Sequence, residues 1–279
     1  AVWNSGAAAS TDLVLVPRLS FHTSSAVTRG PYLQMGTPQS MVVRWRTDAA
    51  SNSCVRYGTQ AGSLGSLACD PAVTTEHAVT VAGLSPDTRY YYSVGTTDAP
   101  LAGGDISYFF DTSPAPGGAI PGRLWVLGDS GTADANAAAV RDAYTTFNAG
   151  ARTNLMLMLG DNAYPDGTDA QYQAAVFDMY PEYLRNTVLW PTLGNHDGVS
   201  ADSATQTGAY YDIFTLPKTG EAGGLASGTE AYYSFDYGNI HFICLESFET
   251  DRSPASAMMT WVQQDALATS RQWVIAFWH

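Results

Sequence analysis

The sequence is poor in charged residues, and above all in lysine. Only 14% of its 279 residues are charged, well below the roughly 25% of an ordinary soluble domain. Lys218 is the single lysine, and the formal net charge is −13. Because nucleic-acid phosphates are bound by clustered lysine and arginine, and no such cluster occurs, the composition argues against a nucleic-acid surface. So few charges are also more usual outside the cell, which favours a secreted or periplasmic protein.

Long apolar runs are absent as well. No stretch of 18 apolar residues occurs, so the sequence predicts no membrane-spanning helix. The first ten residues contain neither a basic region nor a long apolar run, and they lack an initiator methionine. We therefore interpret the chain either as a mature product whose signal peptide has been removed, or as a chain that was expressed without one. Residues 1–24 show no clear period and are interpreted as an N-terminal arm or a first edge strand.

Cysteine is scarce, with three residues in the chain. Cys54 and Cys69 lie on either side of a loop rich in glycine and serine. A disulfide between them would close a loop of about 15 residues and would stabilise the fold by roughly 3 kcal/mol. The alternative is a pair of reduced thiols. Cys244 lies in the apolar run 240–245, where a buried thiol is expected.

Residues 25–113 have the pattern of an all-β domain. Short runs of alternating polar and apolar residues are separated by turn residues, which predicts a β-sandwich. The runs cover residues 40–46, 54–57, 77–81, 88–94 and 106–110. The segment Gly83-Leu-Ser-Pro86, followed by Tyr90, resembles the corner of a fibronectin type III domain.

Residues 114–122, rich in proline and glycine, form the predicted linker to a second domain, residues 123–279. Leu124–Leu127 and Leu155–Leu159 are continuous apolar runs, which are typical of buried parallel strands. The residues between them predict a helix that stops near Gly150, so the three elements form a βαβ unit. The apolar side of this helix is expected to consist of Val140, Tyr144 and Phe147.

The rest of the second domain continues the mixed pattern. A helical stretch from about residue 169 is interrupted by Pro181. Residues 188–193 predict a third strand, which Pro191 should make irregular or edge-like. Three further elements are expected, in chain order: a hairpin turning at 236–239, a helix over about 254–269, and a last strand over 272–278.

Metal-binding residue types follow the predicted strands. Three strands run into short polar motifs, which are Gly128-Asp-Ser-Gly131, Gly160-Asp-Asn-Ala-Tyr164 and Gly194-Asn-His-Asp197, and the last strand ends in His279. Because the carboxyl ends of parallel strands face one crevice, these side chains should converge. The leading glycine of each motif should let the backbone turn sharply. Carboxylate, amide, phenol and imidazole groups suit hard or borderline cations. One carboxylate can bridge two metals about 3.5–4 Å apart, a spacing used for displacement at phosphorus.

In this order, the four motifs resemble four of the five motifs of the purple acid phosphatase family. The resemblance extends over residues 25–279, because a leading β-sandwich also fits that family. It implies an α/β metallophosphoesterase sandwich, with mixed sheets flanked by helices, preceded by an all-β fibronectin III-like sandwich. It further implies an acid phosphatase that hydrolyses the phosphate monoester bond of a small phosphorylated substrate.

The resemblance implies a role for each motif residue. Asp129 and the phenolate of Tyr164 would bind a ferric iron, and Asp161 would bridge it to a second metal. Asn195 and His279 would bind that second, divalent metal, which could be zinc, manganese or iron. The nucleophile would be a metal-bound hydroxide.

His196, by contrast, is expected to be the catalytic residue and not a metal ligand. The resemblance implies that it contacts the phosphoryl oxygens and protonates the leaving group. Glu246, Asp166 and Asp197 lie near the motifs and are expected to be solvated or to support the ligands.

The fifth motif of the family, Gly-His-x-His, supplies one histidine to each metal and does not occur in residues 1–279. The sequence stops at His279, directly after the apolar run 273–278. We therefore expect the second domain to be C-terminally incomplete and the protein to continue.

Other functions remain open at this point. A phosphodiesterase or a nucleotide hydrolase could use the same site, and a binding or adhesion module could keep the fold without catalysis. The segment Gly128–Gly131 also resembles the signature around a serine-protease nucleophile. However, Thr132 stands where that signature has a further glycine, and a parallel α/β unit surrounds it.

Overall fold

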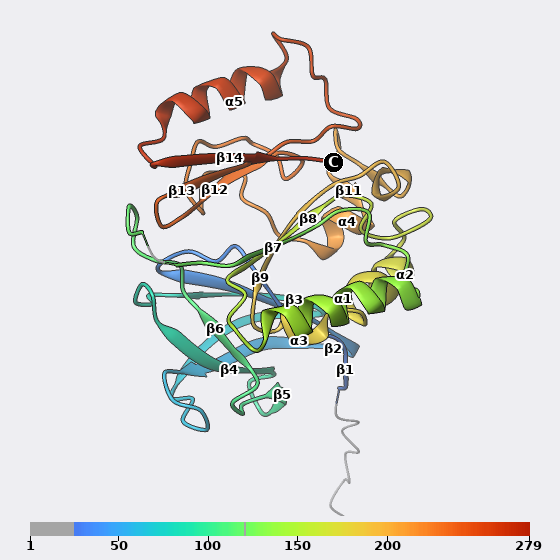
Figure 1. Ribbon diagram of the computed structural model, residues 1–279. Coiled ribbons are helices and arrows are strands. Elements are labelled where there is room, and N and C mark those ends of the chain that lie inside the picture. Colours follow the sequence, from blue (N-terminus) through green and yellow to red (C-terminus); the bar gives the residue numbers. More distant parts are fainter. Residues whose placement is uncertain (1–24, 120) are drawn as a thin grey trace, which may run out of the picture.

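The computed structural model describes residues 25–119 and 121–279 (Figure 1). The predicted N-terminal arm, residues 1–24, lies outside the described residues. No helix in the described part of the chain is long and apolar enough to cross a membrane. The predicted domain boundaries, at residues 113/114 and 122/123, stay a prediction.

The N-terminal part is a β-sandwich. Its strands are β1 (Val27–Gln34), β2 (Ser40–Gly58), β3 (Ser66–Ala82), β4 (Arg89–Gly95), β5 (Pro100–Gly103) and β6 (Phe109–Asp111). The long strands β2 and β3 pair antiparallel from Ser40↔Ala82 to Tyr57↔Ser66, with an irregular register between Arg46 and Ser53. The first half of β2 also pairs with β1 and its second half with β4. This confirms the predicted all-β architecture, although the runs 40–46 and 54–57 belong to one strand.

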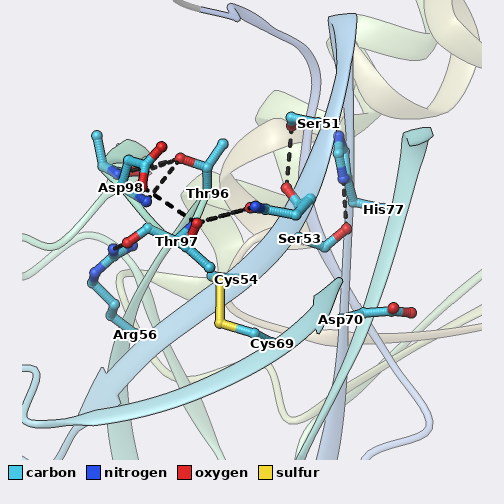
Figure 2. The surroundings of a disulfide bond; sticks show 12 residues. Ser51, Ser53, Cys54, Arg56, Cys69, Asp70, His77, Thr96, Thr97 and Asp98 are labelled. Carbon is cyan, nitrogen blue, oxygen red and sulfur yellow. Dashed lines mark hydrogen bonds between the residues drawn. A yellow bond between two sulfur atoms is a disulfide. The ribbon is translucent and has the colours of Figure 1, made fainter. Parts of the chain in front are cut away.

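A disulfide joins Cys54 to Cys69 across this β2–β3 pair (Figure 2). The two residues are direct cross-strand partners, 15 positions apart in sequence. The predicted pairing is therefore confirmed. Cys244 is a buried free thiol, as expected, and burial raises its pKa to about 12.

The βαβ unit is formed by β7 (Leu124–Leu127), α1 (Ala135–Asn148) and β8 (Leu155–Leu159), and β9 (Val188–Thr192) follows. These strands are parallel, in the order β9-β8-β7. Strand β1 of the sandwich pairs with β9 at Leu33↔Val188, so the two parts share one continuous sheet. The predicted unit is confirmed, but β7 is an edge strand and its Val126 is half exposed.

The predicted apolar side of α1 is wrong. Val140 is 58% exposed and Phe147 is 81% exposed. The helix instead packs on the sheet with its Tyr144 side, and the Tyr144 ring stacks on that of Trp125 with 3.8 Å between centroids. Arg123 also donates a hydrogen bond to the buried Asn148, with 2.7 Å between Nη1 and Oδ1. The stacked ring of Tyr144 and the hydrogen bond to Asn148 thus decide which side of α1 packs on the sheet, and the spacing of its apolar residues does not.

Strand β9 is not at an edge, contrary to the expectation from Pro191. All five of its residues are buried, and it lies between β8 and β1. Because β1 pairs only with Val188, no ladder partner is needed at Pro191 on that side. The Pro191 carbonyl instead accepts hydrogen bonds from the hydroxyls of Tyr210, at 3.0 Å, and Tyr233, at 2.6 Å.

Short helices and strands connect β8, β9 and the following sheet. They are α2 (Asp169–Tyr172), the π-helix η1 (Gln173–Phe177), α3 (Pro181–Leu184), the 3-10 helix η2 (Asp197–Val199), β10 (Ala201–Asp202), β11 (Thr207–Gly208) and α4 (Ala209–Ile213). Pro181 opens α3, so the predicted helical stretch is interrupted where expected.

The C-terminal layer contains β12 (Tyr233–Tyr237), β13 (Ile240–Cys244), α5 (Ala257–Ala268) and β14 (Trp273–Phe277). β12 and β13 form the predicted hairpin, and β14 pairs parallel to β13. Figure 1 shows this layer above β7–β9, with α5 on its outer side. Phe235 of β12 stacks on Trp190 of β9 at 3.8 Å between ring centroids, which joins the two sheets. The second part is therefore a mixed α/β structure with few helices.

Candidate metal centre

The turns after β7 and β8 have unusual backbone conformations. Asp129 and Asp161 have φ values of 53° and 50°, in the left-handed region that only a few non-glycine residues adopt. Gly160 has a φ of 85°, and a Cβ there would lie 2.6 Å from that of His279. A Cβ on Gly194 would lie 2.1 Å from the backbone nitrogen of Asp161. Glycine is thus needed at two of the three predicted positions.

Gly128 is the exception. Its φ lies outside the left-handed region, and a Cβ there would make only an ordinary 3.6 Å contact with Leu159. The sharp turn after β7 is made by Asp129 itself. Its backbone nitrogen donates to the Gly160 carbonyl at 3.1 Å, which ties the first turn to the second.

The turns bring three titratable side chains into one cluster. Asp129, Asp161 and His279 each offer a ligand atom, and these atoms all lie within 4.8 Å of one another. Asp161 is buried, whereas Asp129 is exposed and His279 is half-buried. The Tyr164 hydroxyl donates to Asp129 Oδ1 at 3.2 Å. Asn195 Oδ1 lies 3.1 Å from His279 Nε2. All five side chains that the sequence proposes as ligands therefore lie together.

The hydrogen bonds of His279 determine which ring nitrogen faces the cluster. Its Nδ1 lies 2.9 Å from the carbonyl oxygen of Leu159, which can only accept, so Nδ1 carries the proton. In the neutral ring, Nε2 then presents a lone pair to Asn195 Oδ1 and to Asp161 Oδ1, at 3.1 and 3.5 Å. Nε2 thus lies beside one amide oxygen and one carboxylate oxygen. A histidine held in this way through its other nitrogen is the usual arrangement of a metal ligand.

His196 is fixed by a similar contact. Its Nδ1 lies 2.6 Å from the carbonyl oxygen of Pro165, so Nδ1 donates. Nε2 lies 3.9 Å from Asp161 Oδ2, and the backbone nitrogen donates to Asp161 Oδ1 at 3.0 Å. The ring packs against Tyr164, with 4.6 Å between ring centroids. Its side chain is 38% exposed, so the ring lies at the open edge of the cluster.

Burial, followed by the nearby carboxylates Asp161 and Asp129, raises the pKa of Tyr164 well above that of an ordinary tyrosine. Without a cation the side chain is therefore a neutral phenol, as its hydrogen bond to Asp129 requires. A cation beside the oxygen would reverse this electrostatic preference.

Asp197 has a larger structural role than its place in the sequence indicates. It is completely buried and joins the second turn to the third. Its Oδ2 accepts from the backbone nitrogens of Asn162, at 3.1 Å, and Gly194, at 2.9 Å, and its Oδ1 accepts from the Tyr172 hydroxyl at 2.6 Å. Burial raises the pKa of Asp197, and these hydrogen bonds oppose that rise. Its position directly after His196 was the only available signal in the sequence.

The other two neighbouring acids differ from each other. Glu246 is completely buried, and its carboxylate accepts backbone N–H groups from Phe248, Glu249 and Thr250. It therefore supports the loop that begins with Ser247, whose hydroxyl donates to the His279 carbonyl at 2.7 Å. Asp166 is exposed and solvated.

Comparisons with known proteins find sequence similarity to purple acid phosphatases. Residues 28–112 match the N-terminal domain of purple acid phosphatases. Purple acid phosphatase 23 of Arabidopsis thaliana is 26% identical over 73% of this chain and 48% of its own length. Purple acid phosphatase 1 of Ipomoea batatas is 26% identical over 91% of this chain and 54% of its own. Probable inactive purple acid phosphatase 1 of Arabidopsis thaliana is 24% identical over 90% of this chain and 44% of its own.

The structural similarities are weaker. A fibronectin type III domain of human contactin 1 overlaps 42% of this chain with 18% identity and a TM-score of 0.28, which is too low to support an argument. The relatives in sequence extend across both parts of the molecule. The chain is thus similar to purple acid phosphatases, through the match of its N-terminal part to a family domain and through relatives that are 25–26% identical over most of its length. It spans about half the length of the curated relatives that it matches.

Proposed function

We propose that this protein hydrolyses phosphate monoesters as an acid phosphatase, at a centre of two cations. The observation that carries the proposal is the group formed by His279 Nε2 and the Oδ1 atoms of Asn195 and Asp161, which lie 3.1 and 3.5 Å from that nitrogen. A cation is the simplest partner for such a group. Asp129 and Tyr164 extend the same cluster on its other side.

The residues fit two cations. Their donor atoms are oxygen and nitrogen, which suit hard or borderline metals better than soft ones. Asp161 has one carboxylate oxygen near His279 and belongs to the same cluster as Asp129, which suits a bridging role. Asp129, Tyr164 and Asp161 would hold ferric iron, while Asp161, Asn195 and His279 would hold zinc, manganese or ferrous iron. Two such cations supply an activated water and neutralise charge on the phosphoryl group.

His196 is the proposed general acid. The Pro165 carbonyl holds its Nδ1 proton, so the ring presents Nε2 to the cluster. With a proton on Nε2, the side chain can donate it to the oxygen of the departing alcohol. This transfer matters most for poor leaving groups, whose developing alkoxide charge is least stable.

The compartment is inferred from the disulfide. A structural Cys54–Cys69 bond persists in oxidising surroundings. We therefore propose that the protein is secreted or periplasmic. Its substrate is proposed to be a small phosphorylated compound, because the chain has few cations with which to bind a polyphosphate.

Turnover of two aryl phosphates distinguishes this proposal from its alternatives. The protein, equilibrated with iron and zinc, should hydrolyse an aryl monoester in mild acid and a bis-aryl diester much more slowly. Faster diester hydrolysis would favour a phosphodiesterase or a nucleotide hydrolase. No turnover of either ester by protein that holds both metals would favour a binding or adhesion module, and one relative is named as probably inactive.

A further inference from the structure

Two arginines of the β-sandwich hold one carboxylate of the α/β part. Arg46 and Arg29 both donate to Asp169: Arg46 Nη1 lies 2.7 Å from Oδ2, and Arg29 Nη2 lies 2.8 Å from Oδ1. The Arg29 side chain is fully buried, and its Nε donates to Gln173 Oε1 at 2.8 Å. Hydrogen bonds from Arg46, with Arg29, lower the pKa of Asp169 to about 2. The pair of cations therefore keeps this carboxylate charged.

Asp169 is the first residue of α2, and it directly follows the site loop, which we define as residues 162–168. Thr168 caps the helix through the backbone nitrogen of Gln171. Gln171 Oε1 accepts in turn from the backbone nitrogens of Asp166 and Thr168, both at 3.0 Å. The last residues of the site loop are thus fastened to the helix that the two arginines hold.

The site loop contacts the candidate centre in three places. It carries Tyr164, whose hydroxyl donates to Asp129. It also carries Pro165, whose carbonyl fixes the ring of His196. Gly167 packs so closely that a Cβ there would lie 2.6 Å from Asp197 Cα. A displacement of the site loop would therefore change the direction in which His196 Nε2 points.

We propose that Arg29 and Arg46 are positioning residues for the candidate centre, acting through Asp169 and the site loop on Tyr164 and His196. This gives the β-sandwich a part in catalysis, because it holds the far end of the loop whose near end directly follows Asp161. The kinetic consequence rests on the proposed phosphatase function, whereas the order of the loop does not.

A second ion pair between the two parts provides a matched control. Arg152 Nε lies 2.8 Å from Asp111 Oδ2. Its side chain is 24% exposed, against 26% for Arg46. Arg152 precedes β8, however, and Asp161 follows that strand. The control pair thus lies at the opposite end of β8 from the centre, and a five-residue strand is about 17 Å long.

Hydrogen exchange tests the order of the loop without requiring any activity. The backbone nitrogens of Tyr164 and Gly167 donate to the carbonyls of Gly131 and Ala163, both at 2.9 Å. In Arg46→Met these two amides should exchange about tenfold faster than in the wild type, since exchange follows local opening. In Arg152→Met they should exchange at the wild-type rate. Equal exchange in the two variants would overturn the proposal.

A double-mutant cycle tests the link to His196. On a monoester with a poor leaving group, Arg46→Met should lower kcat about tenfold while metals stay bound, and Arg46→Lys should restore part of the loss. The same change in a His196→Ala background should cost almost nothing further. Additive losses would show that Arg46 does not act through His196 and would refute the proposal. A wild-type protein without phosphatase activity would refute the proposed function instead, and hydrogen exchange would still decide the role of the arginines.

Discussion

A buried histidine in the C-terminal layer should make the stability of this protein fall in alkali. His241 of β13 has a completely buried side chain. Its Nδ1 lies 2.8 Å from Asp236 Oδ1, and its Nε2 lies 2.8 Å from Asp265 Oδ2. Ionised carboxylates can only accept, so both ring nitrogens donate and the ring is an imidazolium. Arg271 Nε donates to the other oxygen of Asp236 at 2.9 Å.

The size and sign of the effect follow from the pKa of His241. Burial alone would lower this pKa, but the hydrogen bonds to Asp236 and Asp265 outweigh burial and raise it from 6.5 to about 9. The stabilisation is therefore fully present below pH 6.5 and is lost as the pH rises through about 9. The rise in pKa corresponds to at most about 3 kcal/mol of stabilisation. His241→Gln leaves the buried Asp265 without its cation, while Asp236 keeps Arg271, and should cost about 3–5 kcal/mol at neutral pH.

Urea unfolding between about pH 6 and pH 10 measures this contribution as a difference between the wild type and His241→Gln. The free energy of unfolding should fall more steeply in the wild type above neutral pH. His77→Gln is the matched control, because His77 is equally buried but pairs with the hydroxyls of Thr47 and Ser53. Burial lowers the pKa of His77, so its stabilising contribution is lost as the pH falls below 6.5. Parallel curves for the wild type and His241→Gln above neutral pH would refute the reasoning.

Three further outcomes are expected. His196→Ala should lower kcat by about 10²–10⁴-fold on poor leaving groups and less on good ones, with metals retained; loss of both metals would show that His196 is a ligand. Tyr164→Phe should remove the visible charge-transfer band of iron-loaded protein, and an unchanged spectrum would exclude the phenolate as a ligand. Replacing Cys54 and Cys69 by serine should lower the free energy of unfolding by about 3 kcal/mol for their 15-residue loop; a denaturant midpoint unaffected by reduction or substitution would contradict this.

The parts of the fold that the sequence predicts well depend on local pattern. Continuous apolar runs identify β7 and β8, and the turn residues place the β12–β13 hairpin. The errors concern what each element packs against. Phe147 looks like a core residue by its spacing, yet the stacking of Tyr144 on Trp125 turns it outward. Pro191 looks like an edge residue, yet β1 diverges from β9 before reaching it.

In the candidate site, too, the features set by local sequence are predictable and those set by packing between distant segments are not. Its motif residues follow strands, and parallel strands place their ends together, so the cluster could be anticipated. The residues that hold the cluster come from elsewhere. Pro165 holds the ring of His196 through its backbone carbonyl, and since every residue has such a carbonyl, the sequence does not identify this contact. Arg46 reaches Asp169 across 123 positions of sequence. Such contacts depend on how the two parts meet in space.

Metal content tests the central claim most directly, since every proposed role depends on a two-cation centre. Protein equilibrated with iron and zinc and then freed of excess metal should contain about two metals per chain, one of them iron. Asp161→Asn should lose most of both, because this residue is the proposed bridge. Asp166→Asn, the same change at an exposed neighbour, should keep the wild-type content. Metal content unchanged in Asp161→Asn, or full phosphatase activity in metal-free protein, would contradict the account.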